Sequence, residues 1–150
     1  MTLLIALLVL AGCGGGDGGP SHGEFTADAN RICREGEQAV TDTVERAQQE
    51  GMPDDPEERA ATLLETATRA YEPILVDLRE LEAPEDLRAD WDTFLDRVNE
   101  AYDLFPQLAD ATRAGDREQL GELARRFQEI AEETRPFAQD NDLGDCLPEV

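Results

Sequence analysis

The chain has 150 residues, about the length of one domain, and its 35 acidic residues outnumber 13 arginines to give a net charge of −22. This charge argues against binding to nucleic acids or to anionic lipid headgroups, because such binding depends on clustered Lys and Arg. A hydrophobic share of 40% and long periodic segments also argue against a disordered acidic tail. We therefore expect a folded domain with an acidic, solvated surface.

The N-terminus starts with a short apolar run that ends at a cysteine. Residues 3–10 are all apolar, too few for the about 20 residues that span a bilayer but typical of the apolar region of a secretory signal. The sequence LAGC at positions 10–13 resembles the lipobox of bacterial lipoprotein precursors. The resemblance implies that residues 1–12 are a signal peptide cleaved before Cys13. It also implies that the Cys13 thiol carries a lipid, which would anchor the protein on the extracytoplasmic face of the cell membrane.

A glycine-rich stretch follows the cysteine. Six glycines occur within residues 14–23, and ordering so many glycines carries a high entropic cost. Residues 13–24 are therefore predicted to form the lipidated cysteine and a flexible tether, and residues 25–150 to form the folded domain.

Apolar residues in the folded part recur at three- and four-residue spacing, which predicts helices, and strand patterns are absent. The predicted helices cover about residues 27–50, about 57–81, the segment from Ala83-Pro84 to Gly115-Asp116, and the segment from there to about residue 140. Thr26 is the predicted N-cap of the first helix. Four helices joined by short loops predict an all-α, up-down-up-down four-helix bundle.

Three prolines fall inside these predicted helices: Pro73, Pro106 and Pro136. Each removes a backbone donor, so each is expected to kink or break its helix. Kinks in neighbouring helices can open a pocket, and Tyr71 and Tyr102 lie near two of the prolines. The two tyrosines are therefore the candidate pocket lining, and the alternative is that both are ordinary core residues.

If Cys13 carries lipid, Cys33 and Cys146 remain, and an exported protein is expected to pair them. In an alternating bundle the start of the first helix and the end of the fourth lie at one pole, which predicts that the two cysteines meet there. The alternative is two free thiols. The tether joins the same pole, so the loop at 51–56 and the turn at 114–116 are expected to face away from the membrane.

Two short motifs carry a second resemblance. Asn30-Arg31-Ile32-Cys33 near the mature start and Asp142-Leu143-Gly144-Asp145-Cys146 near the end resemble, in their layout, small helical lipoproteins of actinobacteria. The resemblance implies a membrane-anchored, extracytoplasmic protein, and it supplies no activity or catalytic residues.

The residue inventory argues against most catalytic chemistry. His22 and Ser21 are the only histidine and serine, both fall in the predicted tether, and the chain has no lysine. The predicted folded domain therefore lacks the residues for a Ser/His/Asp catalytic triad or a Cys/His catalytic dyad. It also lacks the histidines for a His/Cys zinc site or a Glu-x-x-His di-iron site. Residues 140–145 look like a calcium loop but carry Gly144 at the fifth position and Asp145 at the sixth, which breaks the spacing. We predict no catalytic residue, no metal site and no cofactor.

The lipobox-like sequence, the glycine-rich tether and the lack of catalytic residues together favour a non-enzymatic module. This module would bind a protein or small-molecule partner while anchored to the membrane through Cys13. One alternative is an acidic, cation-binding envelope protein. A less favoured alternative is a carboxylate-dependent hydrolase, which needs two close acidic side chains in a cleft.

Overall fold

The computed structural model describes residues 19–147, so Cys13, the preceding apolar run and most of the glycine stretch lie outside the described residues. The elements are α1 (His22–Glu50), α2 (Pro56–Glu80), α3 (Arg88–Tyr102), α4 (Leu104–Ala114), α5 (Arg117–Asp140) and the 3₁₀ helix η1 (Gly144–Cys146). No strand occurs between residues 19 and 147. The prediction of an all-α fold is confirmed.

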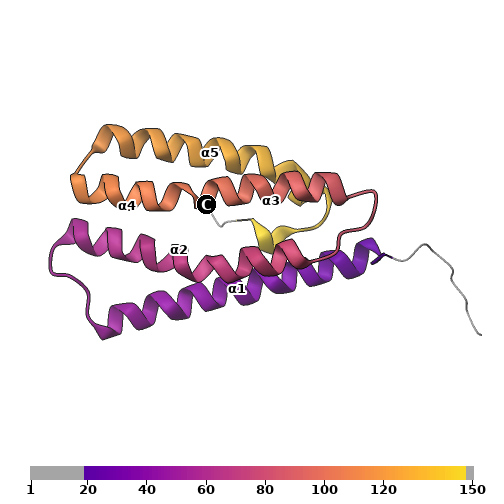
Figure 1. Ribbon diagram of the computed structural model, residues 1–150, viewed down its shortest axis with the longest axis horizontal. Coiled ribbons are helices and arrows are strands. Elements are labelled where there is room, and N and C mark those ends of the chain that lie inside the picture. Colours follow the sequence, from indigo (N-terminus) through magenta and orange to yellow (C-terminus); the bar gives the residue numbers. More distant parts are fainter. Residues whose placement is uncertain (1–18, 148–150) are drawn as a thin grey trace, which may run out of the picture.

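The helices lie roughly along one long axis (Figure 1). α1 packs against α2, and α2 packs against α4 and, less extensively, α3. α3 and α4 follow one another in one line, and α5 contacts both of them. Two helical layers result: one holds α1 and α2, and the other holds α3, α4 and α5.

α1 begins five residues earlier than the sequence pattern predicts. Ser21 is the N-cap: its hydroxyl accepts from the Glu24 N–H, and the Glu24 carboxylate accepts from the Ser21 N–H at 3.0 Å. Thr26, the predicted N-cap, lies inside the helix and donates to the Asn141 carbonyl. The prediction was wrong because apolar periodicity begins only at Phe25, whereas the helix starts on a polar capping box. His22 and its neighbours in the predicted tether are therefore helical.

The third predicted helix is two helices, separated at Asp103. Pro106 has no N–H to donate to the carbonyl four residues earlier, that of Tyr102, so the break predicted for this proline is present. α2 and α5 instead continue through Pro73 and Pro136. Loss of one internal hydrogen bond is tolerated in these two helices, whose neighbouring turns pack against the rest of the bundle.

The chain turns back after α5. Asp142 adopts a left-handed conformation (φ 54°), and the Leu143 N–H donates to the Ala138 carbonyl at 2.8 Å, as in a Schellman motif. Leu143 is thereby buried completely. Residues 141–147, here named the C-terminal return, then run along α1.

A disulfide joins the C-terminal return to α1, between Cys33 and Cys146, whose Cα atoms are 5.1 Å apart. The predicted pairing is confirmed, but its place is not the pole of the molecule. Cys33 follows His22 by eleven residues, about 17 Å along the helix. The bond lies further in because α1 starts early and the C-terminal return folds back along it.

Two apolar clusters form the core. The larger one joins α1, α2, α3, α5 and the C-terminal return around Trp91, whose ring lies 5.0 Å from that of Phe25 and 5.4 Å from that of Phe94. The smaller one lies between α4 and α5 and contains Leu104, Ala111, Leu123 and Ile130. The space between the two clusters is where a cavity opens.

Candidate ligand-binding cavity

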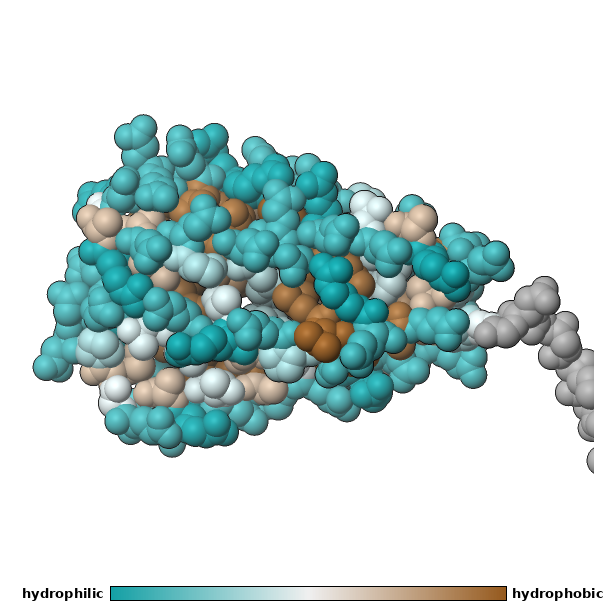
Figure 2. All heavy atoms as spheres, viewed as in Figure 1, coloured by the Kyte–Doolittle hydropathy of each residue, from teal (hydrophilic) through white to brown (hydrophobic). Residues whose placement is uncertain are grey.

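A cavity of about 250 Å³ opens between α1, α2, α3 and the C-terminal return. Its walls are formed by Cys33, Glu37, Tyr71, Ile74, Leu75, Leu78, Phe94, Val98, Tyr102, Asp145, Cys146 and Leu147. Figure 2 shows apolar residues reaching the surface in the middle of this face, in the region where η1 lies in Figure 1, with hydrophilic residues around them. The cavity is therefore mainly apolar and opens to solvent.

A second lobe of about 90 Å³ continues the cavity towards α5. The two lobes share five wall residues: Tyr71, Phe94, Val98, Tyr102 and Cys146. The second lobe adds residues from α4 and α5, among them Phe105, Phe127 and Ile130. The two lobes thus adjoin each other at this shared wall, and the second lobe reaches the smaller core cluster.

Tyr71 and Tyr102, the tyrosines singled out from the sequence, stand side by side in the shared wall. Their ring centroids are 4.4 Å apart and the rings are tilted by 37°. Burial, and after it the charge and hydrogen bonding of Tyr71, raise the pKa of the Tyr102 hydroxyl well above its ordinary value. Tyr102 therefore presents a ring and a neutral hydroxyl, not a phenolate, even at pH values at which an ordinary tyrosine ionises.

Aromatic rings continue from the tyrosines into the second lobe. The Phe105 ring lies 5.5 Å from that of Tyr102 and 5.8 Å from that of Phe127. These spacings are those of directly contacting aromatic rings. An aromatic wall therefore runs along the length of the cavity.

The charged groups of the wall are two carboxylates, Glu37 and Asp145, and no arginine lines either lobe among residues 19–147. Glu37 is exposed and stands one helical turn after Cys33, on the same face of α1. Asp145 pairs with Arg34, and its N–H donates to the Asn30 side-chain oxygen at 3.1 Å. The mouth thus holds one carboxylate paired with Arg34 and one, Glu37, that no arginine among residues 19–147 pairs with.

The two motifs that carried the second resemblance contact each other directly. The Asn30 amide donates to the Asp142 carbonyl at 2.8 Å while accepting from the Asp145 N–H. The disulfide, one turn further along α1, holds the same two segments together. These contacts fix the C-terminal return as one wall of the cavity. The segment that resembled a calcium loop is therefore the end of α5 and the start of this wall.

Several wall residues were not singled out from the sequence. Phe94 and Val98 belong to the predicted apolar stripe of the third helix, and nothing in that stripe separates a cavity wall from a packed core. Glu37 was not distinguished from the other acidic residues of the predicted solvated surface. Its position four residues after Cys33 was the available signal, because both side chains then lie on one helix face.

Ser21 and His22 belong to the folded part, which corrects the expectation that the domain lacks both residue types. The Ser21 hydroxyl is engaged with Glu24 in the capping box. The His22 Nε2 lies 2.9 Å from the Asp86 carboxylate, and this hydrogen bond lowers the Asp86 pKa. Both pairs are exposed and neither brings a serine hydroxyl to a histidine.

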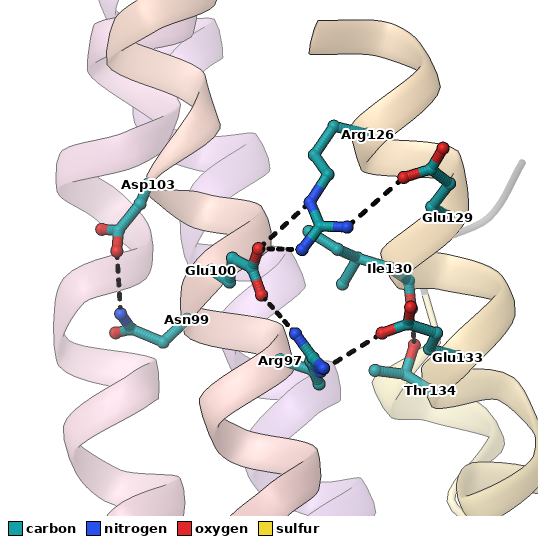
Figure 3. A network of polar contacts seen from close by, with 9 residues as sticks. All are labelled: Arg97, Asn99, Glu100, Asp103, Arg126, Glu129, Ile130, Glu133 and Thr134. Carbon is teal, nitrogen blue, oxygen red and sulfur yellow. Dashed lines mark hydrogen bonds and ion pairs between the residues drawn. The ribbon is translucent and has the colours of Figure 1, made fainter.

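A second polar cluster fastens α5 to α3 (Figure 3). Arg126 binds Glu100 and Glu129, and Arg97 binds Glu100 and Glu133. Arg126 first, and Arg97 second, lower the pKa of Glu100. Each arginine is matched by carboxylates from both helices, so this network serves to hold the helices together.

No group of three or more His, Cys, Asp or Glu side chains suited to a metal ion comes together in the described part of the chain. None of the helices between residues 19 and 147 has the length and apolar character needed to cross a membrane. Compared with known protein families, curated proteins and solved structures, the chain gives no match.

Proposed function

We propose that this chain is a lipid-anchored, non-enzymatic binding protein that holds a small, largely apolar molecule between its two helical layers. The observation that carries the proposal is the cavity itself: apolar walls with two adjacent tyrosine side chains. Ligand sites typically combine apolar walls with a few convergent polar groups. The tyrosines and the two mouth carboxylates are those polar groups here.

The volume sets the size of the ligand. A cavity of about 150 Å³ in another protein holds one benzene molecule. By proportion, the main lobe of about 250 Å³ accommodates a ligand with about ten carbon-sized atoms, and the second lobe extends this slightly. Phospholipids and long acyl chains are too large to be enclosed.

The anchoring part of the proposal rests on the lipobox-like sequence ending at Cys13, and the Cys33–Cys146 disulfide supports it independently. Disulfides form and persist in oxidising compartments outside the cytoplasm. With the four helical rods alternating up-down-up-down, as we propose, the tether leaves one end of the bundle. The loop at 51–55 and the turn at Gly115 then face away from the membrane.

Binding is tested with 2-phenylethanol, a neutral molecule of suitable size. The single tryptophan, Trp91, stacks on the wall residue Phe94 and serves as the fluorescent probe, with saturation-transfer NMR as a second readout. We expect saturable binding that Val98→Phe abolishes by filling both lobes. Val76→Phe is the control, because Val76 is 52% exposed on α2 and lines neither lobe. Absence of saturable binding by the unmodified protein, or equal loss in both variants, overturns the proposal.

Anchoring is tested by mass spectrometry of the mature protein recovered from membranes. We expect an N-terminus at Cys13 that carries added acyl mass. We also expect the Cys13→Ala variant to be absent from the membrane fraction. An intact N-terminus with unmodified Cys13 contradicts the anchoring proposal without affecting the binding proposal.

A further inference from the structure

We propose that the cavity selects an organic cation, such as a protonated arylalkyl amine, over neutral and anionic molecules of the same shape. This inference rests on the proposed binding function and names its ligand class. It follows from three features of the wall: its carboxylates, its aromatic rings and its apolar side chains.

The charges of the wall all have one sign. Among residues 19–147, the carboxylates that line it are Glu37 and Asp145, and none of the arginines in this part of the chain lines either lobe. Asp145 is already paired with Arg34, whereas no arginine pairs with Glu37 within residues 19–147. Glu37 therefore has carboxylate oxygens available to a ligand cation. A carboxylate ligand would meet repulsion at the same mouth and from a chain of net charge −22.

The aromatic wall supplies the second attraction. The faces of Tyr and Phe rings carry negative electrostatic potential, and a cation within about 6 Å of a ring centroid is attracted to it. Tyr71, Tyr102, Phe94 and Phe105 all line the space, and the rings of Tyr71 and Tyr102 are only 4.4 Å apart. An ammonium group in the shared part of the cavity therefore adjoins more than one aromatic side chain, and each ring face turned towards it adds attraction.

The rest of the cavity wall is suited to the hydrocarbon part of a ligand. Ile74, Leu78 and Val98 offer only carbon surface. A molecule with a hydrocarbon part and one ammonium group satisfies both regions. A fully polar cation, such as an inorganic ion, makes no contact with the apolar walls, and a pure hydrocarbon makes no ion pair with Glu37.

The test compares three molecules of nearly equal size at pH 7: phenethylamine, which is protonated, neutral 2-phenylethanol, and anionic phenylacetate. We expect phenethylamine to bind about five- to tenfold more tightly than the alcohol, from the cation–π attraction and one exposed carboxylate together. Phenylacetate should bind most weakly. The advantage of the amine should shrink with added salt, because the carboxylate contribution is screened.

Matched variants separate the wall from the general negative charge of the protein. Glu37→Gln should lower the amine-to-alcohol affinity ratio, whereas Glu45→Gln, which changes the net charge equally on the same helix but lies outside the wall, should not. Tyr102→Leu should also lower the ratio, by removing a ring face. Folding of each variant is checked by circular dichroism, and the ratio within one variant is independent of the fraction folded.

The outcomes discriminate between the two proposals. Equal affinity for amine and alcohol overturns the cation inference and leaves the binding function standing. A cation preference unchanged by both Glu37→Gln and Tyr102→Leu also overturns it, since the preference then comes from the overall charge. No saturable binding of any of the three molecules overturns the proposed function itself.

Discussion

Gly36 sits where α1 crosses α2, and replacing it with alanine tests whether that close approach shapes the cavity. A Cβ added at Gly36 would lie 2.5, 2.7 and 2.9 Å from the Cδ1, Cγ1 and Cγ2 atoms of Ile74. All three distances are far shorter than van der Waals contact. Ile74 is only 8% exposed and is β-branched, so its side chain has little freedom to rotate away. Since Ile74 also lines the cavity, α1 and α2 must separate, or Ile74 must move into the cavity.

The size of the effect follows from two opposing contributions. Overpacking a well-filled site typically costs about 1–3 kcal/mol. Alanine is a better helix former than glycine by about 1 kcal/mol, which offsets part of that cost. Gly121 in α5 is the matched control, because a Cβ there meets nothing within 4 Å. Gly121→Ala should therefore stabilise the protein by about 1 kcal/mol. We expect the free energy of unfolding of Gly36→Ala to be about 1–3 kcal/mol below that of Gly121→Ala.

The assay is urea unfolding followed by far-ultraviolet circular dichroism, with the disulfide intact. Ile74→Val removes Cδ1, the atom of closest approach. The loss of unfolding free energy caused by Gly36→Ala should therefore be smaller in the Ile74→Val variant than in the unmodified protein. Equal stabilisation by Gly36→Ala and Gly121→Ala would refute the close crossing. A penalty that stays the same in the Ile74→Val background would show that some other contact causes it.

Three further predictions concern the C-terminal return and the α3–α5 network. Replacing Cys33 and Cys146 together with alanine opens a loop of sequence separation 113 and should lower the free energy of unfolding by about 4–5 kcal/mol in the chain-entropy model; an unchanged urea midpoint contradicts this. Asn30→Ala removes two hydrogen bonds to the C-terminal return and should cost about 1–2 kcal/mol, with faster hydrogen exchange in η1 and not in α4. Glu100 has a lowered pKa in the folded state, so its stabilisation is present above its unfolded pKa, about 4.5, and is lost as the pH falls through the folded pKa. The acid-induced loss of stability should therefore be shallower in Glu100→Gln than in Glu122→Gln, and identical pH profiles would contradict the network's role.

The helical class and the disulfide could be predicted from the sequence because both depend on local pattern and simple counting. Apolar residues at three- and four-residue spacing identify helices without tertiary information. The start of α1 was missed because Ser21 and Glu24 form a polar capping box in a stretch whose composition indicates a linker. The break between α3 and α4 was foreseeable, since Pro106 cannot donate to Tyr102. Pro73 shows the limit of that rule, because packing around α2 outweighs one lost hydrogen bond.

The path of the C-terminal return could not be predicted. Helices often end on glycine in the left-handed conformation, yet here Asp142 adopts it and the nearest glycine, Gly144, lies two residues further on. The sequence therefore gave no sign that Leu143 would be buried and that the chain would run back along α1. The consequence is that the disulfide lies well inside the bundle and that Cys146 becomes a cavity wall.

The second lobe of the cavity lies where the two apolar clusters of the bundle do not merge. Phe94 belongs to the larger cluster and Ile130 to the smaller one, and both line the second lobe. Between them stand medium or small side chains, Val98 and Ala101, which line the second lobe without filling it. Periodicity assigns all four positions to the core, and only the distances between helices show where the core is left unfilled. Larger side chains at 98 and 101 would add buried contacts. The natural residues leave this space unfilled, which is consistent with the proposed binding function.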